Sequence, residues 1–452
     1  MIKKIITILI SFVFFTSCKK FVDIPLPLDQ VQSETVFKNE LTAKAAVVGL
    51  YAQMQSLAFG ITNGGLTLYP GLSAGELQNT SASTDLDPFY NNSIPATNST
   101  GLNSRLYTAA YKYIFHANSI IEKLETSSLP PATKTPLLAE VKLIRSLLFH
   151  YMVNLFGDSP LVTTTDYYTN AVMPRTAKQE VYKQIINDAE EAYNQLPLAY
   201  SSATRARANK TTAAALLARY YLYTGDWVKA EAKATEVISS GFYTLQTNLS
   251  NTFLNTSSET IWQLPKDAAN TTEGQNFIPS SATVKPTYVL TNNLMASFEP
   301  NDLRKTNWTK QNTVSGQPYY YPSKYKTRLT TPITEAYIII RLAEIYLIRA
   351  EAETKQNKLS EAIVDINTIR TRAGIPATAA STQPQLLLAI EQERKVELFS
   401  EWGHRWFDLK RTGRIDEIMA VLKPAWLPTA ALYPIPQNEL LRNAFLTQNP
   451  GY

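Results

Sequence analysis

The chain of 452 residues contains a single cysteine, Cys18, and only three histidines, His116, His150 and His404. With no second cysteine for an internal disulfide, stability has to come from packing. The histidines are far apart and form neither an H-E-x-x-H motif nor a helical pair, so we predict no metal site. Glycine-rich phosphate loops, dinucleotide fingerprints and G-x-S-x-G elbows are also missing. We therefore predict no cofactor and no catalytic residues of those classes.

Excess charge is small as well. The formal net charge is +5, and loss of Lys3 and Lys4 with an N-terminal signal would leave +3 (5 − 2). Domains that bind nucleic acid usually carry a much stronger basic excess, so no nucleic acid is expected among the partners. The apolar content of 44% is sufficient for a large core.

Long apolar runs are confined to the N-terminus. Lys3 and Lys4 precede an apolar stretch over residues 5–15, which is the layout of a secretory signal. A spanning helix needs roughly 20 apolar residues; this stretch is shorter, and no later segment has such an uninterrupted run. Residues 1–17 are predicted to be a lipoprotein signal peptide, with the lipid on Cys18; a free thiol is the alternative. Residues 18–35 are predicted to be an extended tether.

Helical periodicity dominates from residue 36 onward, which predicts a mostly α fold. In the clearest segment, residues 211–241, Leu217, Ala218 and Tyr221 share one face and Gly225 separates two helices. This spacing resembles a tetratricopeptide repeat, and residues 343–376 repeat it more loosely. The predicted helices are 105–125, 135–156, 177–196, 211–224, 227–239, 335–356, 359–373 and 384–401.

Two regions, 56–104 and 241–334, are rich in Gly, Ser, Thr, Asn and Pro and have little helical periodicity; a short strand is expected at Thr260–Leu264. Long irregular regions are often functional, and aromatic faces with polar neighbours suit sugars. Ordinary loop packing is the alternative for each single residue. The candidate ligand-binding residues are Tyr69, Asp85, Phe89, Tyr90 and Asn91 in the first region and Tyr288, Trp308, Tyr319, Tyr320 and Tyr321 in the second.

The C-terminal part carries the most specific pattern. A helix that is apolar nearly all round follows Arg341, so it should be a buried central helix in which Arg341 pairs with Glu344. Glu393, Glu397 and Glu401 step along one face of a helix that is expected to end at Gly403. Arginines and large aromatics flank these acids, so we predict a buried ion-pair network, with a catalytic role as the alternative.

Three functions remain open from the residues alone. A binding protein that uses the two loop-rich regions is the first. A surface glycoside hydrolase is the second, because that chemistry needs only two suitably spaced carboxylates, which sequence spacing does not reveal. A helical interaction scaffold without a small ligand is the third.

Seven segments between Phe21 and Tyr452 read, in order, FVDIPLP, AAVVGLYAQM, LIRSLLFHYMVNLFGDSPLV, RLAEIYLIRAEA, ELFSEWGHRWFDLKRTGR, LYPIPQNEL and QNPGY. Together, and in this order, they resemble the SusD/RagB family of nutrient-uptake lipoproteins. The resemblance implies tetratricopeptide-like helical pairs in a single SusD-like domain over residues 36–452. Within it, 36–240 is the N-terminal helical part, 241–334 the loop-rich part and 335–452 the signature part.

The same resemblance implies a function. The protein would be lipid-anchored on the outer face of the outer membrane, where it would deliver oligosaccharide or another nutrient to a TonB-dependent SusC-type transporter without catalysis. The family's starch-binding residues do not map cleanly onto residues 56–104, so starch itself is not implied. The shared segments belong to the scaffold and leave the ligand open.

Overall fold

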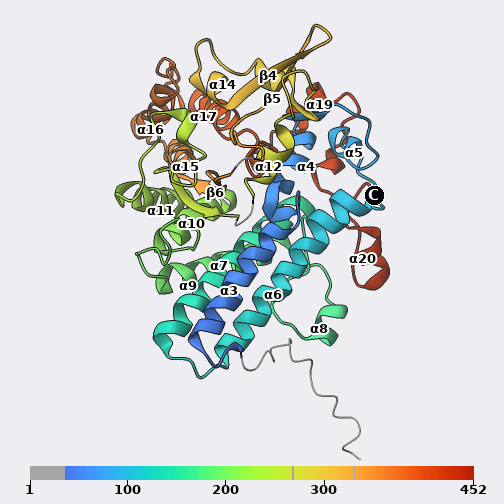
Figure 1. The fold of residues 1–452 in the computed structure, drawn as a ribbon, viewed down its shortest axis with the longest axis vertical. Helices are drawn as coiled ribbons and strands as arrows, with labels where there is room; N and C mark the ends of the chain where they lie inside the picture. Colours follow the sequence, from blue (N-terminus) through green and yellow to red (C-terminus); the bar gives the residue numbers. More distant parts are fainter. Residues whose placement is uncertain (1–35, 267–268, 330) are drawn as a thin grey trace, which may run out of the picture.

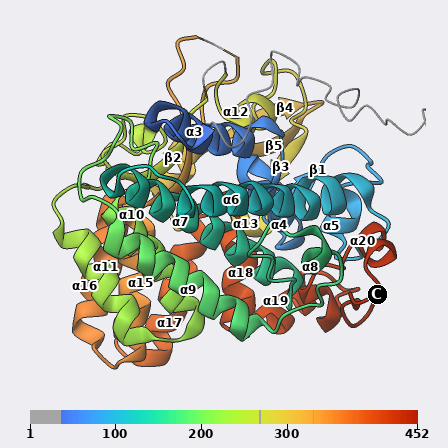
Figure 2. The ribbon, with the colours of Figure 1, turned by 90° about the horizontal axis from the view of Figure 1, so that it is seen from below.

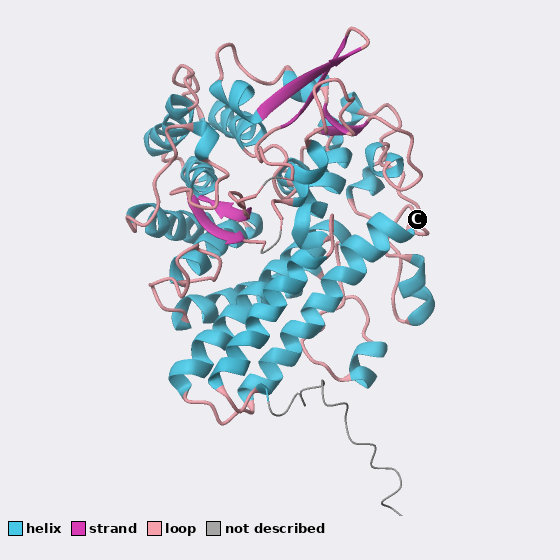
Figure 3. Ribbon diagram, in the orientation of Figure 1, coloured by secondary structure: helices cyan, strands magenta, loops and turns pink. Residues whose placement is uncertain are grey.

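The computed structural model describes residues 36–266, 269–329 and 331–452. The predicted signal peptide, Cys18 and the tether lie outside these residues. Helices dominate the described chain and its strands are short, which confirms the mostly α fold (Figures 1 and 3). The α-helices are α3 (Glu40–Ser56), α4 (Leu66–Ser73), α5 (Asp87–Tyr90), α6 (Ala109–Glu125), α7 (Pro131–Phe156), α8 (Tyr167–Ala171), α9 (Lys178–Gln195), α10 (Lys210–Thr224), α11 (Trp227–Ser239), α12 (Thr272–Phe277), α13 (Asn292–Met295), α14 (Leu303–Trp308), α15 (Leu342–Lys355), α16 (Leu359–Arg372), α17 (Gln383–Glu397), α18 (His404–Arg411), α19 (Ile415–Leu422) and α20 (Gln437–Arg442).

Six strands form three separate two-stranded antiparallel sheets in the described chain, β1–β3, β2–β6 and β4–β5. Wider π-type turns occupy Ile61–Gly65 and Ser99–Thr108, and 3-10 turns occupy Leu249–Asn251 and Pro428–Ala431. The strands are β1 (Leu77–Asn79), β2 (Thr260–Leu264), β3 (Tyr288–Leu290), β4 (Thr309–Val314), β5 (Gln317–Pro322) and β6 (Tyr337–Arg341).

Helix α7 is the central helix of the bundle that α3, α6 and α9 complete (Figure 1). It starts at Pro131, where the missing N–H costs no intrahelical hydrogen bond. It ends at Gly157, whose φ of 73° suits a residue without Cβ. Nearly every side chain from Leu137 to Phe156 is buried, so the helix packs on all sides.

Helices α10 and α11 form the predicted tetratricopeptide-like pair. Gly225, at φ 79°, ends α10, and the Asp226 carboxylate accepts a hydrogen bond from the Lys229 N–H at 3.2 Å to cap α11. Ala230 and Ala234 are fully buried, because their small side chains let α11 approach its neighbours closely. Helices α15 and α16 repeat the arrangement beside α11, which confirms the helical-pair architecture.

Two predicted helices have different ends. Residues 337–341 were expected to be helical but form strand β6, because the β-branched run Ile338–Ile340 pairs with β2 in the core. Helix α17 ends at Glu397 and does not continue to Glu401. Ser400 and Trp402 adopt positive φ values of 51° and 46°, so the chain leaves the helix before Gly403.

The segment Glu40–Ser73 is long and apolar enough to resemble a membrane span, with a mean hydropathy of 1.2 over its best window. It consists of two helices, α3 and α4, separated by non-helical residues that include Asn63 and Gly64. Every residue of α4 is buried, although residues 56–104 were expected to be irregular. The segment therefore belongs to the core of the fold, whose main apolar cluster runs from Phe37 to Ile435.

Candidate binding face

The two loop-rich regions meet in the structure. Strand β1 pairs antiparallel with β3, with Leu77 opposite Leu290 and Asn79 opposite Tyr288. The Thr80 hydroxyl extends the contact by donating to the Pro286 carbonyl at 2.7 Å. Strand β3 also contacts the β4–β5 hairpin at the upper end of the molecule in Figure 1. We call the surface formed by residues 80–105 and 277–321 the binding face.

An aromatic cluster joins the segments beneath this face. Phe277 and Tyr288 lie with ring centroids 5.3 Å apart, and Phe59 lies 5.8 Å from Tyr288. The guanidinium carbon of Arg105 is 6.0 Å from the Phe59 centroid, within cation–π range. Sequence reasoning selected only Tyr288 from this set. An isolated phenylalanine in a polar loop is a weak signal, but it is the one that could have pointed to Phe59 and Phe277.

Three predicted ligand residues are core residues in this structure. Tyr69, Phe89 and Trp308 have no exposed surface. The Tyr69 and Phe89 rings pack 4.6 Å apart, and the Trp308 indole N–H donates to the Leu249 carbonyl at 2.9 Å. Their aromatic faces are therefore covered by protein and do not contribute to the binding face. The long irregular regions of the sequence contain buried helices, and periodicity did not distinguish these from loops.

Asp85 and Tyr288 contribute mainly to the framework. The Asp85 Oδ1 accepts a hydrogen bond from the Gly101 N–H at 2.8 Å, which ties two loops together. A Cβ on Gly101 would lie 2.6 Å from the Tyr69 ring, so the backbone approaches the core too closely for a side chain. Tyr288 is 8% exposed, and its ring belongs to the aromatic cluster.

The β4–β5 hairpin carries the three consecutive tyrosines. Side chains alternate along a strand, so Tyr319 and Tyr321 share one face and Tyr320 points to the other. Tyr321 is buried, Tyr320 packs partly against the main core, and Tyr319 is half-buried. The Lys285 ammonium lies 4.9 Å from the Tyr319 centroid. Tyr319 is thus the hairpin aromatic best placed to contact a ligand.

Tyr90 and Asn91 lie at the end of α5. Asn91 is exposed, and Tyr90 is half-buried with the Lys423 Nζ 3.2 Å from its ring centroid. Burial lowers the pKa of Lys423 to about 8. The structure therefore leaves Asn91, Tyr319 and the partly exposed sides of Asp85, Tyr90 and Tyr320 as candidates, and ligand contact by any of them stays a prediction.

Two buried acids stand behind the face. Burial raises the pKa of Glu273 and of Glu76 to about 7. Thr67 donates to the Glu273 Oε1 at 3.1 Å, but Glu273 Oε2 and Glu76 Oε1 have no hydrogen-bond partner among the described residues. A pocket of about 10 Å³ beside Glu273 and Lys324 has room for one water molecule at most.

The C-terminal acids form the predicted ion-pair network, with different partners. Arg341 pairs with Glu259, Glu397 and Glu401 at 2.6–2.7 Å, and not with Glu344. Glu401 reaches Arg341 because the chain has left the helix at Glu397. These residues are at least nine-tenths buried.

Glu344 pairs instead with Arg219 of α10, at 2.6 and 2.7 Å. The partner belongs to a different helical pair, so spacing along the sequence did not identify it. Burial raises the pKa of Glu344, but Arg219 and then His404 outweigh burial and lower that pKa to about 2.

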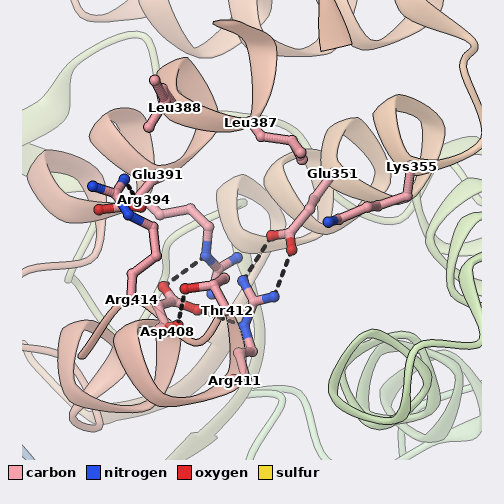
Figure 4. A pocket seen from close by; sticks show the side chains of 10 residues that line it. All are labelled: Glu351, Lys355, Leu387, Leu388, Glu391, Arg394, Asp408, Arg411, Thr412 and Arg414. Atoms are coloured by element: carbon pink, nitrogen blue, oxygen red, sulfur yellow. Dashed lines mark hydrogen bonds and ion pairs between the residues drawn. The ribbon is translucent and has the colours of Figure 1, made fainter. Parts of the chain in front are cut away.

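A charged pocket of about 120 Å³ lies between α15, α17 and α18 (Figure 4). Arg411 binds Glu351 through two hydrogen bonds of 2.6 and 2.7 Å, and Arg394 binds Asp408 at 2.7 Å. Burial opposes the charge on Asp408, yet Arg394 and Arg411 hold its pKa well below the usual range. The general acid of a glycoside hydrolase must keep its proton near neutral pH, so the Asp408 carboxylate suits a scaffold better than acid catalysis.

Comparisons with known proteins agree on one family. A family model described as the SusD family matches residues 242–452, and one described as starch-binding associating with outer membrane matches residues 61–222. A SusD-like protein of Formosa agariphila is 26% identical over 96% of this chain and 97% of its own length.

Solved structures agree with this match. A SusD superfamily protein from Bacteroides vulgatus has a TM-score of 0.81 at 20% identity, covering 92% of this chain and all of that one. A laminarin-binding SusD-like protein has a TM-score of 0.77 at 26% identity, again covering 92% of this chain and 100% of that chain.

Proposed function

We propose, from the premise that this chain belongs to the SusD/RagB family, that it binds carbohydrate at the cell surface and passes it to a transporter. The observation that carries the proposal is the β1–β3 pairing, which joins the two loop-rich regions into one face. That face presents Tyr319, Asn91 and the partly exposed Asp85. Relatives described as starch-binding or laminarin-binding support carbohydrate as the ligand class.

The proposed attachment is a lipid on Cys18, which anchors the protein to the outer membrane with its binding face exposed to the exterior. Helix α3, where the described chain begins, starts at the end of the bundle opposite to the β4–β5 hairpin (Figure 1). The described chain thus begins at the end away from the hairpin, which supports an orientation in which the membrane and the face lie at opposite ends. A multiply acylated cysteine would hold the chain firmly, since each buried methylene contributes about 0.8 kcal/mol.

Binding is tested by calorimetry of the full chain against a glycan panel that includes starch and laminarin fragments. Replacement of Tyr319 by Ala should weaken binding about five- to tenfold, because one stacking surface is lost. Tyr168→Ala is the matched control, since this tyrosine on α8 is 82% exposed and far from the hairpin (Figure 1). Unchanged affinity in Tyr319→Ala would exclude the proposed contact, and failure of every glycan would exclude the ligand class.

The transporter partner is proposed to be a TonB-dependent SusC-type barrel. Affinity purification of the full chain from its native outer membrane should recover such a barrel in a fixed ratio. Recovery of the chain alone after gentle extraction would contradict the pairing.

Hydrolysis is the competing function, and the buried acids argue against it. Glu273 has a pKa near neutrality, as a general acid needs, but it is 2% exposed and lies behind the face. Incubation with each bound glycan should produce no new reducing ends. Their appearance would favour the hydrolase.

A further inference from the structure

A second cleft lies beside one margin of the binding face, where the Gln437 N–H at the start of α20 donates to the Ala96 carbonyl at 2.9 Å. The short helices α8 and α20 come close to each other there, near the C-terminus, in both orientations of the ribbon (Figures 1 and 2). With the start of α6 they enclose a cavity of about 360 Å³, within the ~300–1,000 Å³ range of small-molecule sites. The lining residues that matter below are Tyr107, Tyr111, Tyr167, Asn170, Glu439 and Arg442.

The walls of this cleft are held in place by hydrogen bonds between distant segments. The Asn443 amide donates to the Met173 carbonyl at 2.9 Å, which joins the end of α20 to the loop after α8. Arg175 donates to the Asp158 carbonyl at 2.7 Å and to the Thr447 carbonyl at 3.1 Å. The cleft is therefore largely formed before any ligand arrives, which reduces the entropy cost of binding.

Aromatic rings make up much of its lining. The Tyr107 and Tyr111 centroids are 4.9 Å apart, and the Tyr111 hydroxyl donates to the Pro160 carbonyl at 3.0 Å, which fixes that ring. Tyr167 stands at the rim with 74% of its surface exposed. An exposed tyrosine beside a preformed cleft offers a flat face on which an apolar ring surface can pack.

Polar groups that suit hydroxyls complete the lining. Glu439 and Arg442 form an ion pair at 3.0 Å, with side chains 21% and 70% exposed. Asn170 donates to the Thr164 carbonyl at 2.7 Å, while its amide oxygen has no partner among the described residues. Because the carboxylate and guanidinium already neutralise each other, the cleft favours a neutral polyhydroxylated ligand over an ion.

We propose that this cleft is a second carbohydrate site, distinct from the one proposed at Tyr319. Tyr167 stacks on a sugar ring, and Glu439, Arg442 and Asn170 exchange hydrogen bonds with its hydroxyls. The choice of sugar as ligand rests on the proposed function, whereas the location rests on the cleft alone. Two separate sites on one chain would let it hold a long polysaccharide at two points, which raises avidity when the polymer spans both.

The test combines calorimetry with variants of each site. The full chain is titrated with short starch and laminarin fragments and with the other oligosaccharides of the panel. We expect two bound ligands per chain, and in Tyr167→Ala or Glu439→Gln we expect the affinity at the cleft to fall about five- to tenfold while the affinity at the binding face stays unchanged. Tyr168→Ala is the control, because this neighbour on α8 is more exposed but does not line the cleft.

Each outcome decides the proposal. A single site that Tyr319→Ala weakens, and that Tyr167→Ala leaves unchanged, would overturn the cleft and keep the proposed function. If Tyr167→Ala lowers the affinity for glycan and Tyr319→Ala does not, the cleft is supported and the binding face is overturned. Equal losses in Tyr167→Ala and Tyr168→Ala would assign binding to the exposed surface of α8 and not to the cleft. No binding of any glycan would overturn both sites.

Discussion

Glu273 behind the binding face and Glu344 in the C-terminal core are both buried glutamates, yet their pKa values move in opposite directions. Burial raises the pKa of Glu273 to about 7, and no lysine or arginine of the described chain forms an ion pair with it. Arg219 contacts both oxygens of Glu344 and, against the effect of burial, lowers its pKa to about 2. For these two acids, the presence of a close counter-ion, and not the depth of burial, therefore decides which one is charged.

The contrast in ion pairing extends to neighbouring acids. The C-terminal core contains paired charges such as Arg341 with Glu397 and Glu401, whereas neither Glu76 nor Glu273 forms an ion pair within the described chain. Incomplete hydrogen bonding does not separate the two regions, because Arg372 Nε and Arg394 Nη1 in the C-terminal core also have no partner among the described residues.

Removing the central cation of the paired region should have the largest effect. Arg341→Ala leaves Glu259, Glu397 and Glu401 buried with less compensation, so we expect a loss of about 3–5 kcal/mol in the free energy of unfolding. Urea denaturation measures it. Lys183→Ala on α9, where the lysine side chain is 73% exposed, should change stability by less than about 0.5 kcal/mol. Similar losses in the two variants would refute the comparison.

Lowering the pH should have the second-largest effect, because it weakens the same paired region. The pKa of Glu344 is about 2 in the folded chain and 4.5 ordinarily, so its contribution is complete above pH 4.5 and is lost as pH falls toward 2. The lowered pKa of Glu344 alone corresponds to about 3 kcal/mol of the free energy of unfolding. Unfolding free energies measured from pH 5 to pH 3 should fall steadily. A free energy of unfolding that does not change over this pH range would show that Glu344 is not charged in the folded chain.

Neutralising the unpaired acid should have a smaller effect of opposite sign. Glu273 holds its proton between pH 4.5 and 7 in the folded chain but loses it when unfolded, so it lowers stability as pH rises through that window. Glu273→Gln removes this cost and should stabilise the chain by about 1–3 kcal/mol at pH 8, with little change at pH 4.5. Glu344→Gln should destabilise it at pH 8, because Arg219 loses its charge partner. If Glu273→Gln and Glu344→Gln change the free energy of unfolding in the same direction at pH 8, the contrast between the two glutamates is wrong.

Local patterns predicted the scaffold well and the site poorly. The α10–α11 pair was predictable because the helix break at Gly225 and the small buried residues of α11 depend on residues close to them in the sequence. Strand β6 was missed because the burial of Ile338–Ile340 against β2 overrides helical periodicity. The partner of Glu344 was missed because Arg219 is distant in sequence. Burial of Tyr69, Phe89 and Trp308 depends on the same kind of long-range packing, so composition alone treated them as loop residues.

The pairing of β1 with β3 also has a consequence for the order of folding. Its flanking contact, from Thr80 to Pro286, spans 206 residues. A contact of that range closes a long loop, and the entropy cost delays its formation relative to local helical hairpins such as α10–α11. The helical pairs can assemble as soon as their own residues are present, whereas the binding face has to wait for both halves of the chain. The proposed binding of a ligand is therefore among the last properties that a newly made molecule acquires.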